Sequence, residues 1–224
     1  MSKKLTAVLY AISICFAFGI GVAYTDKSTD VVPVALAKPS VEGPKLAILE
    51  NLHPANMTAK YGDVLKTSYA IANQVDVPPT IVQAILLQES KAGNVKSLVG
   101  SRGAGFGNRS YGVMQMKVEA ARSVMSRTPK LVSKYFPNRS YSSITDEEVI
   151  ALMLTNHEAN IRMACYHLKI YHSMMHDWDA TIVAYNMGIG NAKKTLVFDT
   201  NPYLISVQNY MNATVPSFNS KHNL

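Results

Sequence analysis

The sequence predicts an all-α fold, and three of its features support that fold class. Apolar residues recur at helical spacing over most of the chain beyond residue 57. Helix start and stop signals flank these stretches, as at Pro78 and Gly188. Convincing runs of alternating apolar and polar residues, which would predict a sheet, are lacking.

The first half of the expected domain contains three helices and a loop. A helix over residues 58–75 is separated from one over residues 80–90 by the start signal Asp76-Val77-Pro78-Pro79. Repeated glycines make residues 93–110 an irregular loop that can approach a ligand closely. Beyond Gly112, apolar spacing predicts a helix that begins at residue 113 and carries Val113, Met116, Ala120 and Val124 on one face.

The second half is expected to be helical as well. Thr145 and Glu148 have the spacing of a capping box, and they open a long helical region that runs through Tyr171. Asp177 or Asp179 caps the next helix, over residues 180–185, which stops near Gly188 and Gly190. A last short helix is expected over residues 203–211.

The chain divides into a leader, a tether and one folded domain. Two lysines precede the apolar segment Leu5 to Tyr24, which predicts a signal peptide or, since it is long enough to span a bilayer, a retained membrane anchor within residues 1–24. Residues 25–56 lack periodicity and are expected to form a flexible tether. Residues 57–224 are expected to form the single domain of an exported, periplasmic or cell-envelope protein.

Charge and cysteine content narrow the classes of partner. The net charge of +7 and the pI near 9.3 favour an anionic polymer, and for an exported protein that means cell wall or membrane surface rather than nucleic acid. Only Cys15, in the leader, and Cys165 are present, so no disulfide framework holds the domain. Cys165 is expected to be a small buried hydrophobe in a monomeric protein stabilised by its core.

Glu89 is the most informative residue for function. At helical spacing it extends the apolar stripe of Ile81, Val82, Ile85 and Leu86. Desolvation there disfavours the charged form, so the pKa of the carboxyl group is expected to rise and suit it to donate a proton. The alternative is that Glu89 lies near the helix end and reaches solvent.

Several ordered blocks resemble the lytic transglycosylases of the soluble, goose-lysozyme-like type. Glu89-Ser90 resembles the Glu-Ser pair of that family at the end of a helix. The remaining blocks are Gly112-Val113-Met114-Gln115, Asn160-Ile161 with Tyr166 and Leu168, Ala184-Tyr185-Asn186-Met187-Gly188, and Tyr203-Leu204 with Val207. The chain departs from the family at Lys117 and Val118, where Met and Pro are usual, at Ala164, where Gly is usual, and in an enlarged loop before Gly112.

The resemblance implies a lysozyme-like helical fold with the active-site glutamate at a helix end. It further implies cleavage of the β-1,4 bond between N-acetylmuramic acid and N-acetylglucosamine of peptidoglycan, with formation of a 1,6-anhydro sugar. Glu89 would act first as the acid and then as the base. The implied substrate-binding residues are Ser110, Gly112, Met114, Gln115, Tyr185 and Asn186, with the choice between Ser101 and Ser110 left open.

Two other functions stay open. A hydrolytic muramidase, such as a phage lysis protein anchored through its leader, would use a second carboxyl group, but the other acids stand at helix starts or polar positions. A catalytically silent peptidoglycan-binding module would not need Glu89 at all. His172 and His176 lie one helical turn apart, near His167, but no acid or cysteine cluster completes a zinc site, so no metal or other cofactor is expected.

Overall fold

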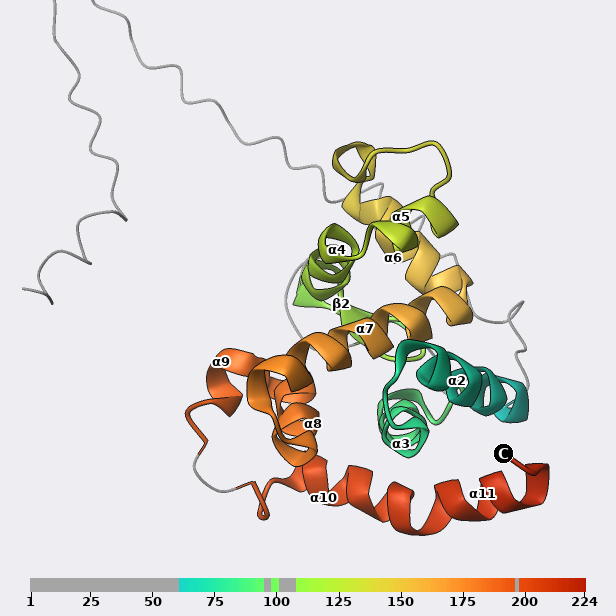
Figure 1. Cartoon of the computed structure of the whole chain (residues 1–224), viewed down its shortest axis with the longest axis vertical. Coiled ribbons are helices and arrows are strands. Elements are labelled where there is room, and N and C mark those ends of the chain that lie inside the picture. The colour runs from blue at the N-terminus through green and yellow to red at the C-terminus, as the bar shows by residue number, and fades with distance from the viewer. Residues whose placement is uncertain (1–60, 95–97, 101–107, 196–197) are drawn as a thin grey trace, which may run out of the picture. The chain divides into compact units, whose positions relative to one another are not determined.

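The computed structural model describes residues 61–94, 98–100, 108–195 and 198–224, and Figure 1 shows that this part of the chain is built almost entirely from helices. The all-α prediction is therefore confirmed. The α-helices are α2 (Tyr61–Val75), α3 (Pro79–Ser90), α4 (Val118–Arg127), α5 (Pro129–Tyr135), α6 (Asp146–Thr155), α7 (His157–Met175), α8 (Trp178–Met187), α9 (Ile189–Ala192), α10 (Pro202–Asn209) and α11 (Val215–His222).

Three short elements complete the described part. A 3-10 turn, η3 (Tyr141–Ser143), precedes α6, and a π turn, η4 (Tyr210–Thr214), joins α10 to α11. The strands β1 (Ser110–Tyr111) and β2 (Met116–Lys117) pair antiparallel, and residue 99 bridges to Tyr111 on the other side. This small sheet brings the segment before α4 against the end of the glycine-rich loop.

Helix α7 is the centre of the core. It contacts α2, α4, α6 and α8, and it crosses the middle of the domain in Figure 1. Ile161, Met163 and Leu168 are fully buried along it. Cys165 is buried among them, so the expectation of a small buried side chain is confirmed, and burial raises the pKa of its thiol to about 12.

Side-chain caps set several helix boundaries. Thr145 and Glu148 form the predicted capping box at the start of α6. The expected long helix is divided at Asn156, whose φ of −129° interrupts it and whose Oδ1 accepts a 2.9 Å hydrogen bond from the Ala159 amide. Of the two candidate caps for α8, Asp177 is the one used, since its Oδ1 accepts from the Ala180 amide at 2.7 Å.

The prediction of a helix from residue 113 is wrong for its first turn. Residues 112–115 form a tight turn, and α4 begins only at Val118. Gly112 has φ +77° and Gln115 has φ +47°, which are left-handed conformations that a helix does not contain. Val113 and Met116 are buried as expected, but through the turn and β2 rather than through a helical face.

The predicted leader and tether lie outside the described residues, as do the first residues of the expected first helix. Among the helices that are described, none has the length and apolar content needed to cross a membrane.

Candidate active site

Helix α3 ends directly after Glu89 and Ser90. Lys91 adopts a left-handed conformation with φ +52°, and its amide and the next one bond to the carbonyls of Leu87 and Leu86. This left-handed cap ends the helix one residue after Glu89. Ser90 is buried and its hydroxyl accepts a 3.0 Å bond from the Gly93 amide, while Glu89 is half-buried.

Glu89 lies in the wall of a cavity of about 720 Å³. Helices α3, α7, α8 and α10 and the small sheet all contribute to that wall. The lining residues are Gln88, Glu89, Val99, Gly100, Asn108, Ser110, Gln115, Met116, Lys117, Ala120, His167, Tyr171, Tyr185, Asn186, Met187, Gly188 and Tyr203. Segments more than a hundred residues apart in sequence therefore meet around one carboxyl group.

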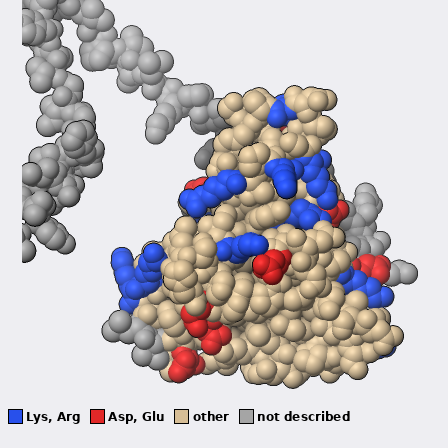
Figure 2. Space-filling model, viewed as in Figure 1, with Lys and Arg blue, Asp and Glu red and all other residues tan. Residues whose placement is uncertain are grey.

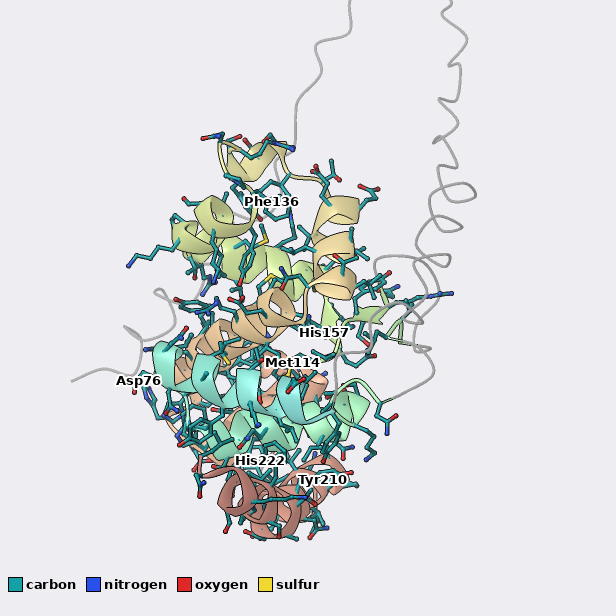
Figure 3. All side chains as sticks on the ribbon, turned by 90° about the vertical axis from the view of Figure 1, so that its right-hand side faces the viewer. Asp76, Met114, Phe136, His157, Tyr210 and His222 are labelled. Carbon is teal, nitrogen blue, oxygen red and sulfur yellow. The ribbon has the colours of Figure 1, made fainter. Side chains whose placement is uncertain are left out.

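Most of the residues implied by the family resemblance meet at this cavity. Glu89, Ser110, Gln115, Tyr185 and Asn186 line it. Gly112 and Met114 are buried and do not line it; Figure 3 shows Met114 inside the domain. Ser101, the alternative to Ser110, lies outside the described residues.

Asn160 of α7 holds the turn behind the cavity. It is fully buried, its Oδ1 accepts a 2.7 Å bond from the Met114 amide, and its Nδ2 donates to the Tyr111 carbonyl at 3.3 Å. A Cβ on Gly112 would lie 2.5 Å from both Asn160 Oδ1 and the Met153 carbonyl oxygen. Glycine is therefore required at position 112 by packing within the protein as well as by its positive φ.

Gln115 uses its amide group mainly within the protein. Its Nε2 donates to the carbonyls of Leu98 at 3.0 Å and Gly112 at 2.8 Å, and its Oε1 accepts from the Ser110 hydroxyl at 3.0 Å. Gly100 passes so close to this pair that a Cβ there would overlap the Ser110 hydroxyl oxygen. Gln115 and Ser110 thus help to fix the shape of the cavity wall.

Two tyrosines of the cavity wall, Tyr185 and Tyr203, are influenced by the carboxyl group of Glu89. The Tyr203 hydroxyl donates a hydrogen bond of 2.6 Å to Glu89 Oε1, and the Tyr185 hydroxyl donates one of 2.7 Å to the Met114 carbonyl. Burial, with the charge of Glu89 as the next cause, raises the pKa of both phenols well above the usual value. Both therefore stay protonated donors at neutral pH.

Tyr203 was not among the candidate site residues taken from the sequence. Tyr203 belongs to the closing block of the family resemblance. Pro202 and the capping residue Asn201 mark the start of its helix, α10, in the sequence. Nothing in the local pattern shows that its hydroxyl reaches a carboxyl group 114 residues earlier.

The remaining lining residues include one histidine and one lysine. Burial lowers the pKa of His167 to about 4, so its ring is neutral at physiological pH, and it packs on Tyr171 with ring centroids 4.1 Å apart. Lys117 is exposed at the rim, and it is the only lysine or arginine among the cavity-lining residues that the structure describes.

The histidines considered as zinc ligands have other surroundings. His172 stacks on Trp178 with ring centroids 3.9 Å apart, while His176 is exposed at the end of α7. Within the described ranges, no group of three or more His, Cys, Asp or Glu side chains is placed to hold a metal ion.

The described domain is all-α and has a glutamate at a helix end in the wall of a cavity, as expected for a lysozyme-like protein. A family model, the transglycosylase SLT domain, matches residues 67–201 of this chain. Because the match covers more than half of the sequence, the chain belongs to the SLT transglycosylase family, and the family predicted from the sequence is confirmed. Membership indicates activity on peptidoglycan, outside the cytoplasm.

Searches of curated proteins and of solved structures each found no match to this chain.

Proposed function

We propose that this protein is a peptidoglycan lytic transglycosylase in which Glu89 is the only general acid and base. One observation carries the proposal: Glu89 is the only carboxylate in the described lining of the cavity, and the Tyr203 hydroxyl is bonded to one of its two oxygens at 2.6 Å. That bond helps to orient the carboxyl group of Glu89 in the wall of the cavity.

The two proton transfers follow from one carboxyl group. Protonated Glu89 donates its proton to the glycosidic oxygen as the bond to the muramic acid C1 breaks. Ionised Glu89 then takes the proton of the muramic acid C6 hydroxyl while O6 bonds to C1. The products are a free N-acetylglucosamine end and a 1,6-anhydromuramoyl end, and Glu89 returns to its protonated form. Water takes no part in this balance.

The distribution of the other acids favours this route over hydrolysis. Ordinary glycosidases place two carboxyl groups ~5–5.5 Å or ~6.5–9.5 Å apart across the bond. In the described part of the chain, Glu158 and Glu148 are instead held in ion pairs with Lys134 and Arg139, at 2.6 and 3.1 Å. Of the residues that the structure does not describe, the internal segments 95–97, 101–107 and 196–197 contain no Asp or Glu, and the four acids of residues 1–60 stand in the expected tether, between positions 26 and 50.

The wall residues are proposed to hold the sugar rings. Tyr185 offers an aromatic edge, Asn186 an exposed amide, and Ser110 a hydroxyl oxygen that can still accept a hydrogen bond. Gly112 and Met114 are proposed to act indirectly, because their backbone keeps the wall in place. Neutral His167 adds a polar group that carries no charge into the cavity.

The surface charge of the domain and the segments that precede it support an anionic polymer of the cell envelope as the substrate. In Figure 2, Lys and Arg side chains cover more of the visible face than Asp and Glu, in keeping with the net charge of +7. We propose that residues 1–24 export or anchor the protein, that residues 25–56 tether it, and that residues 57–224 act as a monomeric catalytic domain in the periplasm or at the cell envelope.

Digestion of purified sacculi, with products identified by mass spectrometry, tests the proposal. We expect muropeptides with 1,6-anhydro ends from the wild-type protein. Glu89→Gln should lower the rate by at least about 100-fold, the low end of what general acid–base groups contribute. The matched control is Asp63→Asn, an exposed acid in the first turn of α2, which should act at the wild-type rate.

Two outcomes would contradict the proposal, and each favours an alternative. Reducing ends without anhydro ends would indicate a hydrolytic muramidase. Binding to sacculi without cleavage, unchanged in Glu89→Gln, would indicate a silent binding module.

A further inference from the structure

The helix that supplies Tyr203 continues well beyond the site. The backbone stays helical from α10 through η4 to α11, since the residues at both junctions, such as Tyr210 and Val215, have right-handed helical φ and ψ values. This helix lies along α3, and all of it follows residue 201, where the match to the family model stops. Its polar contacts with α3 pair Glu89 with Tyr203, Gln88 with Ser206, and Gln83 with Asn219.

The contact between Gln83 and Asn219 is a reciprocal amide pair. Gln83 Nε2 donates to Asn219 Oδ1 and Asn219 Nδ2 donates to Gln83 Oε1, both at 2.9 Å. Gln83 is fully buried in α3, and its Nε2 also approaches the Leu65 carbonyl of α2 at 3.3 Å. Leaving a buried amide group without its hydrogen-bond partner destabilises the fold. The amide pair therefore restricts the relative positions of α3 and α11.

A uniform α-helix would not bring Tyr203 and Asn219 to the same side. Asn219 follows Tyr203 by 16 residues, and a turn of about 100° per residue places it about 160° around the axis. The π turn η4 contains one extra residue, which removes about 100° and leaves about 60° between them. Both side chains can then face α3, as the two hydrogen-bonded contacts require.

The first residue of the π turn is itself held by α3. The Lys91 ammonium group lies 4.7 Å from the centre of the Tyr210 ring and is hydrogen-bonded to its hydroxyl group. Lys91 is the residue that caps α3 directly after Glu89 and Ser90. The register of the C-terminal helix is therefore fixed on both sides of the inserted residue.

We propose that Asn219, through its amide pair with Gln83 and the register set by the π turn, is a positioning residue that keeps the Tyr203 hydroxyl on Glu89. This inference rests on the proposed function, because it assigns a remote contact to the catalytic step. Asn219 is not among the residues that line the cavity, so we infer that its effect on catalysis passes through the contact between Tyr203 and Glu89.

A double-mutant cycle on the full-length protein tests that dependence. We expect Asn219→Ala to lower kcat about 10-fold and to change KM less than about 2-fold, since small displacements of a catalytic contact can cost up to ~100-fold. Tyr203→Phe should lower kcat further. Adding Asn219→Ala to Tyr203→Phe should change kcat less than about 2-fold, because the contact that Asn219 positions is already gone.

A length exchange separates positioning from general loss of stability. Asn219→Gln and Gln83→Asn each change the span of the amide pair and should each lower kcat, whereas the double variant Gln83→Asn/Asn219→Gln restores the span and should recover kcat to within about 3-fold of wild type. These variants keep the amide groups, so they give the answer even if Asn219→Ala does not fold. Ser220→Ala, an exposed neighbour, is the matched control and should match wild type.

A spectroscopic reading does not depend on catalysis. With 3-fluorotyrosine placed at Tyr203, the ¹⁹F resonance of Asn219→Ala should move toward that of Glu89→Ala, in which the hydrogen bond is absent. An inactive wild-type protein with this shift would overturn the proposed function and leave the positioning intact. Any of three results would overturn the positioning role of Asn219. The first is wild-type kcat in every Asn219 and Gln83 variant, and the second is an undiminished effect of Asn219→Ala when it is added to Tyr203→Phe. The third is a ¹⁹F resonance that does not move in Asn219→Ala.

Discussion

His167 is expected to make the folded protein less stable as the pH falls from 7 to 5. Burial against Tyr171 and Tyr185 lowers the pKa of its ring from 6.5 in the unfolded chain to about 4 in the folded protein. As the pH falls, the unfolded chain therefore binds the proton first. Stability present at neutral pH is lost between about pH 6.5 and pH 4 and does not change further below that range.

The size of the effect follows from the difference between the two pKa values. His167 is only 8% exposed, so solvent screening does not reduce the shift appreciably. One pKa unit corresponds to about 1.4 kcal/mol, and at pH 5 the unfolded chain is largely protonated while the folded ring is not. The free energy of unfolding should consequently be about 2 kcal/mol lower at pH 5 than at pH 7 from this residue alone.

Urea unfolding at pH 5, 6 and 7, followed by circular dichroism, measures this dependence. His167→Asn removes the titrating ring and should reduce the difference between pH 7 and pH 5 by about 2 kcal/mol, whatever it costs in packing. Burial also lowers the pKa of His157, so some acid sensitivity should persist in the variant. His176→Asn, at an exposed position, should leave the wild-type dependence unchanged. An unchanged dependence in His167→Asn would refute the reasoning.

Two further predictions concern the cavity wall and its charge. Gly112→Ala should lower the free energy of unfolding by about 2–5 kcal/mol, because a Cβ there is strained by the positive φ and lies too close to Asn160. Gly190→Ala is the control and should leave the free energy of unfolding unchanged, since its Cβ meets nothing within 4 Å. Equal effects of the two substitutions in urea unfolding would contradict this prediction. Lys117→Gln should raise KM about 3–10-fold for glycan strands that carry anionic stem peptides, as expected for the loss of one charged contact. The same substitution should leave KM unchanged for strands without peptides. Equal changes in KM for the two substrates would exclude a role of Lys117 in charge recognition.

The helices that the sequence predicted well are those with a local cause. The start of α3 at the proline pair, the capping box of α6 and the cap of α8 by an aspartate depend on residues within one turn of each other. Helices α5 and α11 were not predicted. In α11 only Val215 is fully buried, so its apolar pattern is weak and its position depends on contacts with α3.

The turn before α4 shows why periodicity alone was insufficient. Val113 and Met116 have helical spacing, and both are buried. What decides their conformation is Asn160, which accepts from the Met114 amide across 46 positions of sequence. A buried side chain that satisfies backbone groups can override a local helical pattern, and a pattern search within a short window does not contain it.

By itself, the sequence determined the helical class, the family, and the position of a glutamate at the end of an apolar helix. Those properties follow from short-range spacing and from ordered motifs. Only the tertiary structure decided that Tyr203 bonds to Glu89, that Gln115 is occupied by the wall, and that a π turn aligns the C-terminal helix with α3. The physical reason is that each depends on distances between atoms of segments far apart in the chain, which close packing of the whole core sets to within fractions of an ångström.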